Sequence, residues 1–143
     1  MLGNIVIGLL TMAVCLLLQS MLVVAALRYY MSHVPKGGVH GIGWAQLRRV
    51  NGVMTLLVLG NIAQVIIWAL VFRMLGEFDV IETAVYHSGV NFATLGYGDI
   101  VMSEHRRLLG PIEAINGALM IGVSTAVLMT VLQDLFKRRG IGE

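Results

Sequence analysis

The chain has 143 residues, of which 57% are hydrophobic and only 13% are charged, and its formal net charge is +2. A soluble domain carries about 25% charged residues, so this composition and the long apolar runs argue against a soluble protein. The small net charge gives nucleic acid little to bind. The single cysteine, Cys15, allows neither an internal disulfide nor a cysteine metal site.

The first apolar segment runs from about Leu2 to Leu27, and a bilayer crossing takes roughly 20 residues. It has no positively charged start, and its apolar run is longer than that of a signal peptide. We therefore expect residues 1–30 to form a retained transmembrane helix. Arg28 is its only basic residue and it carries no polar stripe, so it should lie outside any pore, packed against another helix.

Residues 31–51 begin as a loop rich in glycine and proline and become helical from Trp44, with an aromatic residue and two arginines suited to a membrane interface. The second apolar segment follows from about Val53 to Leu75, and its helix could reach back to Trp44. Polar side chains interrupt the first two segments, and contacts between helices are expected to satisfy them. These side chains are Gln19, Asn61 and Gln64.

A shorter segment from Val80 to Ala93 is apolar with scattered small polar residues. As a helix it would be about 20 Å long, too short to cross the bilayer. It is followed by the sequence TLGYGD, residues 94–99. Non-helical backbone at membrane depth is tolerated only where protein buries it or where it lines water. Thr94 to Gly98 are therefore predicted to line a pore.

The residue types of this stretch suit a cation. A ring of backbone carbonyls can replace the water around a dehydrated ion. Successive carbonyls point the same way only if the backbone alternates between right- and left-handed conformations, and Gly96 and Gly98 adopt the left-handed ones at low cost. Thr94 adds a hydroxyl group at the inner end. The C-terminal end of the short helix carries partial negative charge, which also favours a cation.

The third apolar segment runs from about Leu108 to Phe136. One helical face is either the lining of a water-filled cavity or a packing stripe, and its position after the pore segment favours the cavity. Leu132 or Phe136 would then form a hydrophobic constriction. The face comprises Ala118, Ile121, Thr125, Met129, Leu132 and Phe136.

Glu113 is the least expected residue of the third segment, because a carboxylate inside a membrane is costly and marks a functional site. Its helical phase places it away from the cavity face. It either points behind the short helix, toward Ser88, Asn91 or Asn61, or sits near the outer interface and reaches water.

The basic residues set the orientation. Seven of the ten Lys and Arg residues lie between the first two segments or after the third: Arg28, Lys36, Arg48, Arg49, Lys137, Arg138 and Arg139. The positive-inside rule places both regions in the cytoplasm. The N-terminus and residues 76–107 are then outside a cell membrane, and the C-terminus is cytoplasmic. The outer stretch is either an ordinary solvated loop or a cation-attracting set of Glu77, Asp79, Glu82, Asp99 and Glu104.

The stretch ATLGYGD resembles the selectivity-filter signature of tetrameric potassium channels, usually Thr-Val-Gly-Tyr-Gly-Asp. The resemblance covers residues 52–136 as outer helix, pore helix, filter and inner helix. Leu95 replaces the commoner valine, and Ala93 stands where a second threonine is common. The first transmembrane segment is the main departure from a minimal two-helix channel.

The resemblance implies a role for individual residues. Tyr86 would lie behind the filter and donate a hydrogen bond to Asp99. Gly117 or Gly122 would supply the hinge that such channels often have in the inner helix. The filter carbonyls that would bind K+ belong to Thr94, Leu95, Gly96, Tyr97 and Gly98.

Together these features predict an all-α membrane protein with three transmembrane helices, a re-entrant pore helix and a filter, assembled as a homotetrameric potassium channel among membrane lipids. Residues 137–143 are predicted to form a short cytoplasmic tail. No catalytic constellation is present, which predicts a non-enzyme without cofactors other than K+ in the filter. The alternatives are a weakly selective cation channel, a non-conducting subunit or scaffold, and a potassium-transporter pore subunit. The single intact motif argues against the last.

Overall fold

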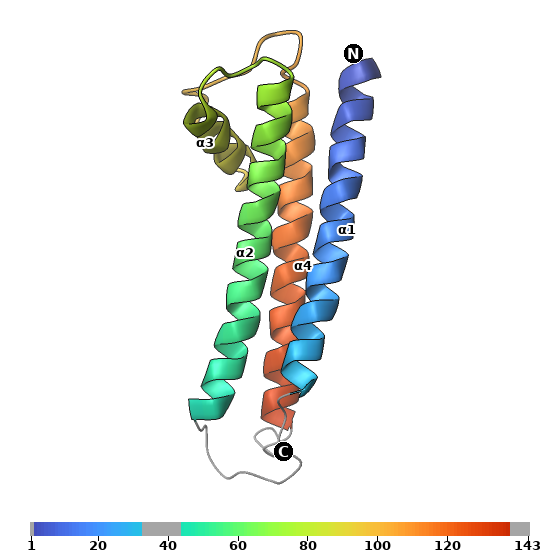
Figure 1. Ribbon diagram of the computed structural model, residues 1–143, viewed down its shortest axis with the longest axis vertical. Helices are drawn as coiled ribbons and strands as arrows, with labels where there is room; N and C mark the ends of the chain where they lie inside the picture. Colours follow the sequence, from blue (N-terminus) through green and yellow to red (C-terminus); the bar gives the residue numbers. More distant parts are fainter. Residues whose placement is uncertain (1, 33–43, 138–143) are drawn as a thin grey trace.

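The computed structural model describes residues 2–32 and 44–137, and these residues form four helices without a strand. Three long helices lie side by side as a bundle, and the short helix α3 lies at one end of it beside α2 and α4 (Figure 1). The helices are α1 (Leu2–Ser32), α2 (Trp44–Met74), α3 (Ile81–Phe92) and α4 (Leu109–Lys137).

The three long helices are long and apolar enough to cross a membrane, which confirms the three predicted spans. At a rise of 1.5 Å per residue each is roughly 45 Å long, enough for the hydrocarbon core and part of both interfaces. Helix α3 has 12 residues and is too short to cross. The re-entrant segment predicted from the sequence is therefore a short helix that lies between two spanning helices.

Two helix ends differ from the prediction. Helix α1 continues past Leu27 to Ser32 because Tyr30 is buried and its hydroxyl donates to Asp134 Oδ2 of α4 at 3.0 Å. Helix α2 begins at Trp44 without a break, so the predicted boundary between residues 51 and 52 falls inside it. Arg49 is buried there, and its side chain donates to the carbonyl of Ala45 one turn earlier (3.0 Å).

Helix α1 packs along α2 and α4 of its own chain, and small residues let it approach closely. A Cβ atom on Gly60 would lie 2.4 Å from Leu22, and one on Gly8 would lie 2.9 Å from Ile112. Close approach of this kind is how membrane helices gain van der Waals contact, because lipid provides no hydrophobic driving force between them. The first helix is thus an integral part of the bundle, as its lack of a polar stripe predicts.

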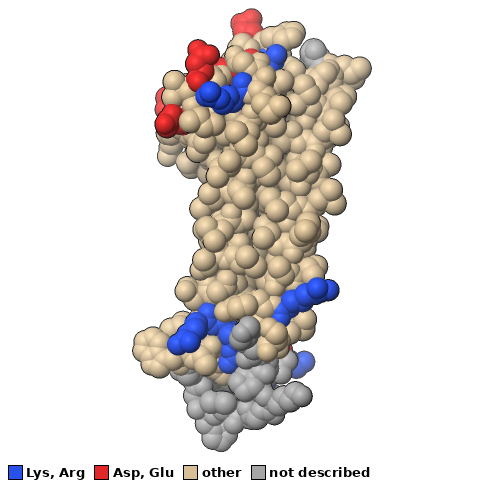
Figure 2. All heavy atoms as spheres, viewed as in Figure 1, with Lys and Arg blue, Asp and Glu red and all other residues tan. Residues whose placement is uncertain are grey.

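The two ends of the bundle differ in charge. The acidic side chains in view gather at the end that carries α3, and a band of basic side chains encircles the opposite end, where α1 ends and α2 begins (Figure 2). The middle is free of charged side chains in this view. Five residues used in the sequence argument lie outside the described residues: His33, Lys36, His40, Arg138 and Arg139.

Candidate ion-conducting site

The chain leaves α3 through a tight turn and then becomes extended. The amides of Thr94 and Leu95 still donate to carbonyls of α3, those of Asn91 (2.8 Å) and Val90 (2.9 Å). Beyond them, residues 95–98 have no regular secondary structure. The last turn of the pore helix therefore holds the start of the filter segment in place.

Every second residue of the filter segment has a left-handed backbone. The φ angles are +59° at Thr94, +58° at Gly96 and +74° at Gly98, whereas Leu95 and Tyr97 have negative φ. Glycine adopts this conformation readily, but for a β-branched threonine it costs on the order of 1–3 kcal/mol. The alternation is the one that carbonyls aimed along a single line require, and the sequence argument had found it only at the glycines.

The filter side chains lack cover within one chain. Leu95 is 54% exposed and Tyr97 is 65% exposed. Behind the segment lies a shallow groove whose lining includes His87, Asn91 and Gly98. The filter is thus supported from one side by its own pore helix, and its other side is open.

Tyr86 and Asp99 join the pore helix to the outer end of the filter. The Tyr86 hydroxyl donates to Asp99 Oδ2 at 2.6 Å, which is the contact that the resemblance implies. This bond lowers the pKa of Asp99 and raises the pKa of Tyr86. Because the folded pKa of Asp99 lies below its ordinary value of 3.8, its contribution is complete at neutral pH and is lost only as pH falls through the lowered pKa.

Tyr86→Phe is expected to shorten the lifetime of the conducting filter at neutral pH by about three- to tenfold, because it removes a hydrogen bond to a charged acceptor. The measurement is the decay of current after the channel is activated. Tyr86→Trp is the matched control, since an indole N–H can donate to the same carboxylate. Equal decay in the parent and in Tyr86→Phe would show that the bond does not support the filter.

His87 and Asn91 form a second contact to the outer end of the filter that the sequence argument missed. His87 is buried, its Nδ1 lies 2.9 Å from the carbonyl oxygen of Ile100, and its Nε2 lies 2.9 Å from Asn91 Nδ2. Burial lowers the pKa of His87 more than the nearby carbonyl and carboxylates raise it, so the ring favours the neutral form. The four-residue spacing of His87 and Asn91 on one helix was the available signal.

Glu113 is fully buried and faces the pore helix, away from the cavity face. The Ser88 hydroxyl donates to Glu113 Oε1, and the same hydroxyl lies 2.8 Å from the carbonyl oxygen of Val65 in α2. A serine hydroxyl has one hydrogen, so both contacts are satisfied together when Glu113 is protonated and shares its own hydrogen with Ser88. The carboxyl group thus joins α4, α3 and α2 behind the filter.

We expect Glu113→Gln to conserve conduction and stability, because an amide can still pair with Ser88. Glu113→Leu should destabilise the assembled protein by about 1–3 kcal/mol, because it leaves Ser88 with one partner fewer in a buried site. Thermal unfolding in detergent and current decay are the two measurements. Glu104→Leu, at an exposed carboxylate, is the control. If Glu113→Leu equals the parent in both, the carboxyl group is a bystander.

The inner helix α4 exposes most of the predicted cavity face. Ile121, Thr125, Met129 and Phe136 are exposed and Leu132 is half-buried. Ala118 on the same face is also exposed.

The two predicted hinge glycines have different surroundings, and α4 runs unbroken through both. A Cβ atom on Gly117 would lie 2.0 Å from the carbonyl oxygen of Phe92, at the end of the pore helix, whereas one on Gly122 would meet nothing within 4 Å. Gly117 therefore permits close packing of α4 on α3. The role of a hinge stays a prediction for both positions.

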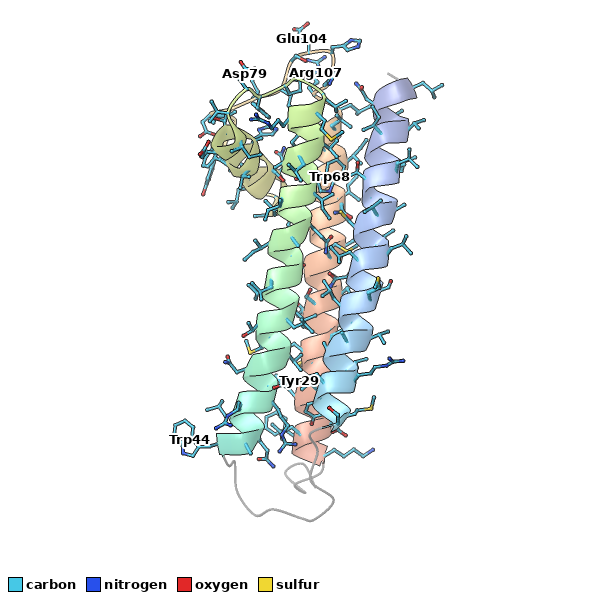
Figure 3. The ribbon with its side chains drawn as sticks, in the orientation of Figure 1. Tyr29, Trp44, Trp68, Asp79, Glu104 and Arg107 are labelled. Carbon is cyan, nitrogen blue, oxygen red and sulfur yellow. The ribbon has the colours of Figure 1, made fainter. Side chains whose placement is uncertain are left out.

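The outer loops order themselves through Glu77. Its carboxylate accepts hydrogen bonds from the amide and hydroxyl of Ser103, both at 2.8 Å, and pairs with Arg106 at 3.6 Å. Glu77 thus belongs to the loop structure, while Asp79 and Glu104 are exposed at this end of the molecule (Figure 3). The exposed carboxylates, which also include Glu82 and Asp99, give the filter entrance a negative character.

A short helix that ends in a left-handed, alternating segment between two membrane-spanning helices defines the pore loop of a channel. A family model described as an ion channel matches residues 55–134, more than half of the chain. The chain belongs to this ion channel family, and it is a multi-pass membrane protein. The matched range holds α3, the filter and most of α2 and α4, but none of α1. Searches among curated proteins and among solved structures found no match.

Proposed function

We propose that this chain is the subunit of a potassium-selective channel that conducts K+ passively through a pore made by four copies. The backbone of residues 94–98 carries this proposal. Left-handed residues at Thr94, Gly96 and Gly98 alternate with right-handed Leu95 and Tyr97, and a line of carbonyls built this way can replace the hydration shell of K+. The ion itself is the cargo, and the pore needs no organic cofactor.

The exposed filter favours assembly around a central axis. One chain supplies one line of carbonyls, and a closed ring of four surrounds an ion. Tyr97 and Leu95, both more than half exposed in one chain, would be covered by neighbouring copies. The exposed face of α4 that contains Ile121, Thr125 and Met129 would then line the cavity below the filter, with Leu132 and Phe136 near its inner end.

The path of an ion follows from this arrangement. The exposed carboxylates at the α3 end attract cations toward the outer entrance. An ion gives up water to the filter carbonyls, passes the hydroxyl of Thr94 and enters the cavity, where the C-terminal end of α3 contributes partial negative charge. The acidic end lies outside the cell membrane and the basic end inside, as the positive-inside rule directs. Residues 52–136, together with the start of α2 from Trp44, form the conducting unit.

Reconstitution of the purified full chain in liposomes tests the proposal. With K+ inside and Na+ outside, the reversal potential of the current should lie close to the K+ equilibrium potential. A reversal potential near zero would instead identify a weakly selective cation channel. Absence of any current would favour a non-conducting subunit. Native mass measurement in detergent should give four copies, and any other number would contradict the ring.

A further inference from the structure

Three buried polar side chains join α1, α2 and α4 near the middle of the bundle. Gln64 Nε2 donates to Gln19 Oε1 at 2.8 Å, and Gln19 Nε2 donates to Ser124 Oγ at 3.0 Å. Gln19 and Gln64 are 3% and 0% exposed, and Ser124 is 9% exposed. Asn61 lies beside them, with Nδ2 at 3.4 Å from Ser124 Oγ. Gln19 is thus the link between the outer helix α2 and the inner helix α4.

The position of this network gives it influence over the pore. Ser124 immediately precedes Thr125, which belongs to the predicted cavity face, and its hydroxyl also donates to the carbonyl of Met120 in its own helix (2.9 Å). At this depth in a bilayer no water is present to replace a lost partner. Any rotation or outward bend of α4 at this level must break or remake the bond between Gln19 and Ser124.

The network has an alternative set of bonds within reach. Gln64 Oε1 is buried and has no hydrogen-bond partner among the described residues, although Gln64 already donates to Gln19. If α4 moves away, the Gln19 amide can donate to Gln64 Oε1, and the two amides then form a closed pair with two hydrogen bonds. Ser124 keeps its bond to Met120. Neither arrangement leaves Gln19 unpaired, so the side chain can exchange between two states.

Helix α1 is held firmly enough to act as the fixed side of this exchange. Leu22 fills the space above Gly60 of α2, and Tyr29 fills the space above Gly52, where a Cβ atom would lie 2.7 Å from its ring. At the outer end, Asn4 Nδ2 donates to the carbonyl of His105 at 2.6 Å. Helices α1 and α2 therefore form one unit against which α4 can shift.

We propose that Gln19 is a positioning residue for the inner helix, and that its exchange between Ser124 and Gln64 sets the fraction of time that the pore is open. The proposal rests on the function proposed above, in which α4 lines the pore. It assigns to the first helix, which lies outside the matched family range, control of opening without a part in ion selectivity.

Single-channel recordings of the full chain test this with Gln19→Met, Ser124→Ala and the double variant. Each single variant should change the open probability in the same direction by about fivefold, the effect of one hydrogen bond. The double variant should change it no further than the larger single effect, because both remove the same contact. Unitary current and reversal potential should stay at the parent values. Ser20→Leu is the matched control, since Ser20 is exposed and bonds only its own helix at Leu16.

Changes of less than twofold, additive effects, or an equal change in Ser20→Leu would overturn the proposal. If Gln19→Met does not assemble, Gln19→Asn replaces it, because the shorter amide cannot reach both partners. A parent channel that passes Na+ as well as K+ contradicts the proposed selectivity but leaves the open probability measurable. If the parent passes no current, the control of opening fails with the proposed function. Thermal unfolding of the same variants then decides whether Gln19 and Ser124 are coupled at all.

Discussion

Gly96→Ala should abolish potassium flux while the protein still assembles. Gly96 has a φ of +58°, and a Cβ atom there would meet nothing within 4 Å of its own chain. The obstacle is therefore the left-handed backbone, which costs an alanine roughly 1–2 kcal/mol in each chain. An alanine that relaxes to negative φ turns its carbonyl out of line, and an ion then loses part of its coordination.

Flux into liposomes and the elution volume of the detergent-solubilised protein measure the two effects separately. Gly3→Ala is the control, because its position in α1 has open space and an ordinary helical backbone. Parent-level flux through Gly96→Ala would remove residues 94–98 from the ion path. Loss of assembly together with flux would show that the segment is needed for the fold itself.

Gly117→Ala should destabilise the assembled protein by about 1–3 kcal/mol, the range for overpacking a close contact. The added methyl group would lie 2.0 Å from the carbonyl oxygen of Phe92. That oxygen belongs to the backbone at the end of the pore helix, so it cannot turn aside as a flexible side chain would. Either α4 or α3 must move, and a movement of α3 displaces the start of the filter.

The control is Gly122→Ala, at the other glycine of the predicted hinge. Its methyl group would meet nothing within 4 Å, and alanine favours a helix over glycine by about 1 kcal/mol. We expect its melting temperature to equal or exceed that of the parent, while Gly117→Ala melts earlier and conducts less. Equal melting of the two variants would mean that the α3–α4 contact does not constrain Gly117.

Local properties of the chain were sufficient to predict the spans and the pore loop. Long apolar runs with few charges produce membrane helices in any context, because the bilayer demands internal hydrogen bonding. The segment before Thr94 is too short to cross, and glycine at positions 96 and 98 permits left-handed backbone. Each of these conclusions depends on neighbouring residues alone, which is why the fold class could be predicted.

Which helix face meets which neighbour could not be predicted in the same way. A membrane helix is apolar on nearly all sides, so its pattern does not distinguish a lipid-facing side from a packed one. The helical phase of Glu113 indicated several polar neighbours, and only the packed helices single out Ser88. His87 gave no sign of its contact with Ile100, because that contact depends on the return of the chain after the filter.

The sequence by itself determined that this protein is an all-helical membrane protein with a re-entrant segment and a TLGYG stretch able to line a pore. These features follow from hydropathy, segment length and the backbone freedom of glycine. Only the tertiary structure decided that α1 lies against α2 and α4 of the same chain, that Gly117 is a packing position, and that Gln19 connects Gln64 with Ser124. Those contacts join residues between 45 and 105 positions apart, and in a bilayer shape and hydrogen bonding select them where hydrophobicity cannot.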